Sequence, residues 1–258
     1  MAHVTLRQDG NPQGKSGRQH GEEASHESLL TLDSYLGDIP FDVCQRYMAV
    51  ARILDRFLAN VSAPLRLLEI GCSAENVLLR LLDPRRVQVT RCHWQARTDD
   101  SEIFLLPDCC PLPMADNTFD AVIALDVIAE IPSDRRRRFL AECERVARYG
   151  IVFSSPKAIP EVREAEAAVA AAYRERHQAA HPVLSLHQAY GLPTAEEFEA
   201  ILREFDRPYV AFDNSPVDSW LAMSLLSESL EERSALARVH GLLNRPLLSG
   251  QLSASSAT

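Results

Sequence analysis

An acid and a glycine close an apolar run, and both residue types suit the binding of a ligand. The run Leu65 to Ile70 is typical of a buried strand; Glu69 lies at its end and Gly71 follows it. Helical spacing begins at Asn76. Glycine in such a turn lets the backbone approach a ligand closely, and the carboxylate accepts hydrogen bonds from amines or hydroxyls. The spacing predicts a ligand-binding turn between a strand and a helix.

Two more acids stand near the ends of later apolar runs. Asp108 follows the short run Ile103 to Leu106, and Asp126 lies within the almost continuously apolar run Phe119 to Val127. An apolar run of that length suits a central strand that is covered on both faces. In a doubly wound parallel sheet, ligands bind beyond the carboxyl ends of the strands. We therefore expect Gly71, Asp108 and Asp126 to converge on one hollow.

Strands and helices alternate through the first part of the chain, which predicts right-handed crossovers and an α/β fold with a doubly wound, mostly parallel sheet. The expected strands are Leu65 to Ile70, Val87 to Cys92, Ile103 to Leu106, Phe119 to Val127 and Gly150 to Ser155. The expected helices are Phe41 to Asn60, Asn76 to Leu82, and one that starts at Pro132, is capped by Ser133 or Asp134, and ends at Gly150.

After the fifth strand the pattern becomes mainly helical. We expect a helix at Glu161 to Gln178, an ordered loop at His181 to Pro193, a helix opened by a Thr194–Glu197 capping box, a strand at Pro208 to Phe212 and mostly helix at Val217 to Leu243. Residues 157–193 are interpreted as a helical insertion or lid within one domain of residues 28–248. Residues 1–27 and 249–258 are polar, which predicts a disordered tail at each end.

The first turn and a second stretch, Leu106 to Pro132, together resemble the class I S-adenosylmethionine-dependent methyltransferases, type 11-like. The second stretch contains Leu112-Pro113 and then Asp116-Asn117-Thr118-Phe119-Asp120 before the central strand, a combination that is typical of this family. The resemblance covers roughly Leu65 to Pro156. It implies a Rossmann-like methyltransferase fold, S-adenosylmethionine as cofactor, and methyl transfer to a small-molecule O or N acceptor.

The resemblance also implies cofactor-binding positions. They are Glu69, Gly71 and Ser73 at the first turn, His93 at the end of the second strand, Asp108 and Cys109 beside the adenine, and Asp126 and Val127 where the fourth strand faces the methyl group. Arg46 and Tyr47, in the helix before the first strand, match the family loosely as residues that close over the cofactor. Glu75, at the start of the next helix, would repel a phosphate, which favours S-adenosylmethionine over a dinucleotide.

Three positions depart from the family pattern and leave a second interpretation open. Ser73 and Glu75 replace glycines of the turn, and His93 replaces an acid that binds the ribose hydroxyls. The family also adds an antiparallel final strand, and no clear strand follows Val217. The alternative function is a non-catalytic methyltransferase-fold protein that acts as a partner subunit or scaffold, with a homodimer through the C-terminal helices as one expected assembly.

The sequence does not identify a catalytic base. Methyl transfer from a sulfonium is a direct displacement that needs alignment, desolvation and at most one base. His187 and Tyr190, in the insertion, are candidates for that base, with simple packing as their alternative role. His177, His181 and His187 have a spacing that can hold a metal, but no acid or cysteine completes the set at a recognisable interval. No metal is therefore predicted.

Composition narrows the remaining function classes. The net charge of -9 disfavours binding to nucleic acid or to an anionic membrane. The consecutive residues Arg135 to Arg138 would point all round a helix, as at a solvated helix start, rather than form one basic patch. No apolar run approaches the roughly 20 residues of a membrane span, and no signal peptide is recognised. Six cysteines without a CxxC pair fit a reducing cytoplasm.

Overall fold

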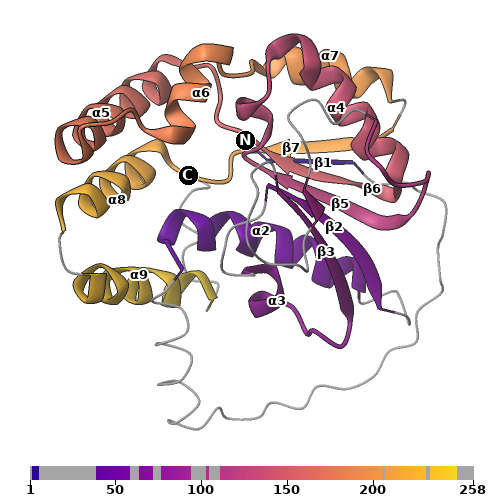
Figure 1. Cartoon of the computed structure of the whole chain (residues 1–258). Coiled ribbons are helices and arrows are strands. Elements are labelled where there is room, and N and C mark those ends of the chain that lie inside the picture. The colour runs from indigo at the N-terminus through magenta and orange to yellow at the C-terminus, as the bar shows by residue number, and fades with distance from the viewer. Residues whose placement is uncertain are drawn as a thin grey trace, which may run out of the picture.

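The computed structural model describes residues 2–5, 39–58, 64–71, 77–93, 103–104, 111–205, 207–230 and 233–248. Within these ranges, seven strands form one sheet with the order β4-β3-β2-β5-β6-β1-β7 (Figure 1). They are β1 (Ala2–Thr5), β2 (Leu65–Ile70), β3 (Val87–His93), β4 (Ile103–Phe104), β5 (Phe119–Leu125), β6 (Ala147–Ser154) and β7 (Tyr209–Phe212). Strands β2 to β6 run parallel, and β1 is antiparallel to both of its neighbours. The predicted α/β class with a mostly parallel sheet is confirmed.

Helices cover both faces of this sheet (Figure 1). They are α2 (Phe41–Leu58), α3 (Val77–Leu81), the 3-10 turn η1 (Ile128–Glu130), α4 (Ser133–Val146), α5 (Pro160–His177), α6 (Pro182–Tyr190), α7 (Ala195–Glu204), α8 (Val217–Ser229) and α9 (Arg233–Leu248). Leu67 and Ile123 share an apolar core with α2 and α3, whereas Leu68 and Val122 share one with α4 and α7. Burial on both faces explains why these strands are almost continuously apolar. None of the helices just given is long and apolar enough to cross a membrane.

Strand β1 lies inside the sheet although it comes from the N-terminus. Val4 is paired with Val152 of β6 on one side and with Val210 of β7 on the other. The disordered tail predicted for residues 1–27 is therefore wrong at β1, and the rest of both predicted tails lies outside the described residues. A four-residue strand is too short to show an alternating pattern, and its partners are distant in sequence. The antiparallel strand that the family resemblance implies thus comes from the start of the chain, while α8 and α9 follow β7.

The ends of α4 differ from the prediction. Pro132 is its N-cap, and neither Ser133 nor Asp134 caps it through a side chain. The helix ends at Val146 rather than at Gly150, because pairing with β5 extends β6 back to Ala147 and places Gly150 within that strand.

The segment 181–193, predicted as an ordered loop, contains the helix α6. Pro182 occupies the first turn, where its missing N–H costs no hydrogen bond. His181 is the N-cap, since its Nδ1 accepts a hydrogen bond of 3.2 Å from the Leu184 N–H. This helix start was not predicted because its N-cap is a histidine rather than the usual serine or aspartate. The predicted Thr194 cap of α7 is present, with the Glu197 N–H donating to Thr194 Oγ1 over 3.1 Å.

Helices α5, α6, α8 and α9 form a group beside the sheet (Figure 1). Helix α5 packs on α8, α6 packs on η1 directly after β5, and α9 packs on α2. The start of α2 is held by α9, because the Phe41 N–H donates to His240 Nδ1 and Asn244 Nδ2 donates to the Ile39 carbonyl, both over 3.0 Å. These two hydrogen bonds fix the position of the start of α2 and therefore the direction in which its following turns project their side chains.

Candidate functional site

Two turns with positive φ mark the carboxyl ends of the neighbouring strands β2 and β5. Gly71 has φ 72° and its N–H donates to the Cys92 carbonyl over 2.9 Å. Asp126 has φ 61° and its N–H donates to the Ser154 carbonyl over 2.9 Å. The left-handed region is uncommon for a non-glycine residue, and such positions cluster at functional sites. Since β2 pairs directly with β5, the structure brings Gly71 and Asp126 to the same edge of the sheet, as predicted.

The Asp126 carboxylate is held between a helix and a strand. Oδ1 accepts a hydrogen bond of 2.8 Å from Ser154 Oγ on β6. Oδ2 pairs with the Arg46 guanidinium of α2, which also contacts Asp42 one turn earlier over 3.2 Å. Arg46 Nε is buried and has no hydrogen-bond partner within the described residues. The guanidinium therefore keeps unused donor capacity at the strand ends.

Glu69, the acid at the end of β2, is 2% exposed. Its Oε1 accepts a hydrogen bond from the Tyr47 hydroxyl of α2. Its Oε2 lies 3.8 Å from Arg91 Nε on β3. A buried carboxylate is tolerated when it is paired and hydrogen-bonded. Tyr47 and Arg46 are consecutive, so α2 directs one donor to each of the two acids at the ends of β2 and β5.

The structure describes only some of the other predicted cofactor-binding residues. Val127 is buried in the core shared with α4. His93 is the last residue of β3, and the structure describes its backbone but not its side chain. Ser73, Asp108 and Cys109 lie outside the described residues, so the convergence of Asp108 with the other two positions stays a prediction.

The two candidate bases are placed very differently. His187 is 6% exposed, and its Nδ1 lies 2.7 Å from Glu166 Oε1. Tyr190, at the end of α6, is 37% exposed. Glu130 of η1 is near His187, and burial raises the pKa of the Glu130 carboxyl. In the part of the chain that is described, no three His, Cys, Asp or Glu side chains form a metal-binding group.

Arg136 is a structural residue that sequence analysis missed. It is 1% exposed, contrary to the solvated helix start expected for Arg135 to Arg138. Its guanidinium donates to the carbonyls of Ile128, Ile131, Tyr190 and Gly191 and pairs with Glu197. The available signal was spacing, since Arg136 precedes the buried Phe139 and Leu140 by three and four residues and so shares their helix face. Arg136 thus links the end of α6 to η1, the turn that begins two residues after Asp126.

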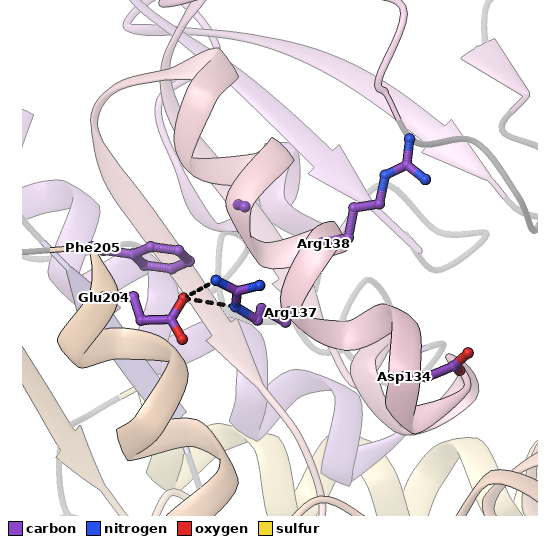
Figure 2. A pocket seen from close by; sticks show the side chains of 6 residues that line it. Asp134, Arg137, Arg138, Glu204 and Phe205 are labelled. Carbon is purple, nitrogen blue, oxygen red and sulfur yellow. Dashed lines mark hydrogen bonds and ion pairs between the residues drawn. The ribbon is translucent and has the colours of Figure 1, made fainter.

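A hollow in the surface lies between α4 and α7 (Figure 2). It is lined by Asp134, Arg137, Arg138, Ala141, Glu204 and Phe205. Arg137 pairs with Glu204 across it over 2.7 Å, and both side chains are exposed. Exposed ion pairs of this kind contribute little, and we assign the hollow no role.

A parallel α/β sheet with a glycine turn and paired acids at adjacent strand ends belongs to the Rossmann-like class of small-molecule-binding folds. Within it, residues 68–153 match the family model of a methyltransferase domain. The match runs from β2 to β6 and confirms the resemblance to the class I S-adenosylmethionine-dependent methyltransferases. A comparison with curated proteins finds none that matches.

Solved structures with a similar fold share little sequence with this chain. A protein from Bacillus halodurans, described as a putative methyltransferase, is 16% identical over 60% of this chain, with a TM-score of 0.38; this chain spans only 64% of its length. A SAM dependent methyltransferase from Aquifex aeolicus is 15% identical over 71% of this chain and 88% of that chain, with a TM-score of 0.39. A putative sarcosine dimethylglycine methyltransferase from Galdieria sulphuraria is 12% identical over 81% of this chain and 83% of that chain, with a TM-score of 0.49.

Proposed function

We propose that this chain binds S-adenosylmethionine and transfers its methyl group to a small-molecule O or N acceptor in the cytoplasm. The observation that carries the proposal is the convergence of Arg46, Tyr47, Glu69 and Asp126 at the ends of β2 and β5. These strands lie in the segment that matches a methyltransferase domain.

The four side chains suit the methionine end of that cofactor, which carries an ammonium group and a carboxylate. Glu69 and Asp126 offer carboxylate oxygens to the ammonium group, and Arg46 offers donors to the carboxylate. The buried Arg46 Nε, which lacks a hydrogen-bond partner among the described residues, is one such donor. Gly71 leaves room for the backbone to approach the ligand.

When bound, S-adenosylmethionine would supply a methyl group on a sulfonium, which is open to direct displacement. The residues of this chain contribute binding, alignment and the exclusion of water. Asp126 is held rigidly for this task, because its backbone N–H and its side chain both bond to Ser154. Ile128 and Ala129, which follow it closely in the chain, are fully buried.

Calorimetry with S-adenosylmethionine tests the proposal on the full chain. We expect saturable binding at micromolar to millimolar ligand and a rise of several degrees in melting temperature with S-adenosylhomocysteine. Absence of both effects at millimolar ligand would rule out the enzyme and support the non-catalytic scaffold. The scaffold has one observation in its favour, since Glu69 and Asp126 already have partners from α2.

Replacing Arg46 by glutamine (R46Q) distinguishes a ligand-binding arginine from a blocking one. If Arg46 binds the cofactor carboxylate, the variant should bind S-adenosylmethionine about 10-fold more weakly, equivalent to ~1.4 kcal/mol. If Arg46 only occupies Asp126, removing it should free that acid and tighten binding. The dissociation constant from calorimetry shows whether R46Q binds S-adenosylmethionine more weakly or more tightly than the wild type. Arg52→Gln, on an exposed position of the same helix, is the matched control and should leave the constant unchanged.

A further inference from the structure

A buried histidine–glutamate pair lies beside the strand ends without forming part of the cofactor site described above. His187 of α6 and Glu166 of α5 are both almost fully buried, with His187 Nδ1 2.7 Å from Glu166 Oε1. Helix α6 packs on η1, which begins two residues after Asp126. Arg136 fastens this contact by donating to carbonyls at the end of α6 and in η1. The pair is therefore held rigidly next to the end of β5.

The hydrogen bond to Glu166 decides which nitrogen of His187 is available. A carboxylate oxygen is a hydrogen-bond acceptor, so the contact with Glu166 favours the tautomer of His187 in which Nδ1 carries the proton. Nε2, on the opposite side of the ring, then holds a free electron pair. This atom is buried and has no hydrogen-bond partner within the described residues. A buried acceptor without a partner is costly, which indicates a place that a ligand is meant to satisfy.

Several other charged or titratable groups surround this pair. Glu130 of η1 interacts with His187 electrostatically. His181 at the start of α6 interacts with His187, Glu166, His177 and Glu228, and its burial lowers its pKa. His177 is itself paired with Glu228 of α8 over 3.0 Å. Each of the other two histidines thus has a structural role: His177 binds Glu228 and His181 caps α6.

We infer that His187 is the catalytic base and Glu166 its positioning residue. The acceptor is then a hydroxyl group, which loses its proton as its oxygen attacks, or an ammonium group, which loses a proton to become an amine before its nitrogen attacks. The inference rests on the proposed function. The acceptor heteroatom forms a bond to the methyl carbon, the carbon–sulfur bond breaks, and the sulfur keeps that electron pair. The acceptor proton moves to His187 Nε2. Glu166 stabilises the resulting imidazolium, which then releases the proton to solvent.

The tautomer of His187 is the first test, and it needs neither cofactor nor acceptor. Nitrogen-15 spectra of the full chain with labelled histidine rings, assigned by the loss of one pair of ring signals in His187→Gln, report which nitrogen is protonated. We expect a proton on Nδ1 and none on Nε2 at neutral pH. Glu166→Leu should shift the proton toward Nε2, whereas Glu166→Gln, whose amide oxygen still accepts, should preserve the wild-type tautomer. A proton on Nε2 in the wild type overturns the inference.

Turnover with a panel of small phenols and amines, with labelled S-adenosylmethionine as methyl donor, is the second test. For a probe that the wild type methylates, H187Q should lower kcat by roughly 100-fold or more. Glu166→Leu should lower kcat with little change in KM, and E166Q should restore part of it. The control His177→Gln should keep the wild-type rate. Unchanged turnover in H187Q overturns the inference; where no probe is turned over, the tautomer alone decides.

Calorimetric binding of S-adenosylmethionine separates a failure of the proposed function from a failure of the role of His187. H187Q should bind S-adenosylmethionine with a dissociation constant within about twofold of the wild type, because the pair acts on the acceptor. Failure of the wild type to bind S-adenosylmethionine refutes the proposed function itself. Normal binding together with the wrong tautomer, or with normal turnover in H187Q, refutes only the role of His187.

Discussion

Replacing Arg136 by alanine (R136A) is expected to lower the free energy of unfolding by about 3 to 5 kcal/mol, because a buried guanidinium that serves several buried acceptors is removed. The guanidinium is 1% exposed and serves four backbone carbonyls as well as Glu197. Without it, these acceptors stay buried and lose their donor. Urea unfolding followed by circular dichroism gives the difference directly. Because α6 would lose its attachment to η1, R136A should also loosen the position of His187.

Arg137 offers a matched control one residue further along α4. Its pair with Glu204 is exposed (Figure 2), so Arg137→Ala should change the free energy of unfolding by less than about 1 kcal/mol. If R136A proved no more destabilising than Arg137→Ala, the buried network around Arg136 would not exist in solution.

Placing proline at Val4 is expected to detach the N-terminal strand from the sheet at a cost of about 3 kcal/mol. Val4 stands between Val152 and Val210 in a strand with a neighbour on each side. Proline removes the N–H of that residue and is found in sheets almost only at edges. Losing β1 would also leave β7 without its partner and expose the edge of β6. The melting temperature and the hydrogen exchange of residues 147–154 measure this effect.

Val4→Ile keeps the backbone N–H and the branched side chain, so it should retain the melting temperature of the wild type. If V4P melts like V4I and the amides of β6 stay protected, β1 is not part of the sheet in solution. The effect of the proline is expected even though β1 has four residues, because the strand holds β6 and β7 together.

Much of the central fold was predictable because its signals are local. Strand β2 lies at the predicted residues, and α2 begins at the predicted Phe41 and is helical through Leu58, where the described part of that segment ends. Both follow from apolar spacing, which reflects burial on one stripe of a helix or on both faces of a parallel strand. The positions of Gly71 and Asp126 also followed, since parallel strands bring their carboxyl ends to one edge.

The errors arose where distant segments decide the structure. Strand β1 exists because β6 and β7 present unpaired edges to it, and nothing within its four residues reveals them. Arg136 is buried because α6 and η1 offer it carbonyls from two separate segments. Helix α6 was missed for a local reason instead, because histidine is an unusual N-cap.

The sequence alone determined the alternation of strands and helices, the resemblance to a methyltransferase domain and the two acids at the strand ends, since each depends on the type and spacing of nearby residues. Only the tertiary structure decided which partners those acids have. Tyr47 reaches Glu69, Arg46 reaches Asp126, and Glu166 orients His187. These pairs join residues that are 21 or more positions apart, and no local pattern specifies contacts that depend on how whole helices pack against the sheet.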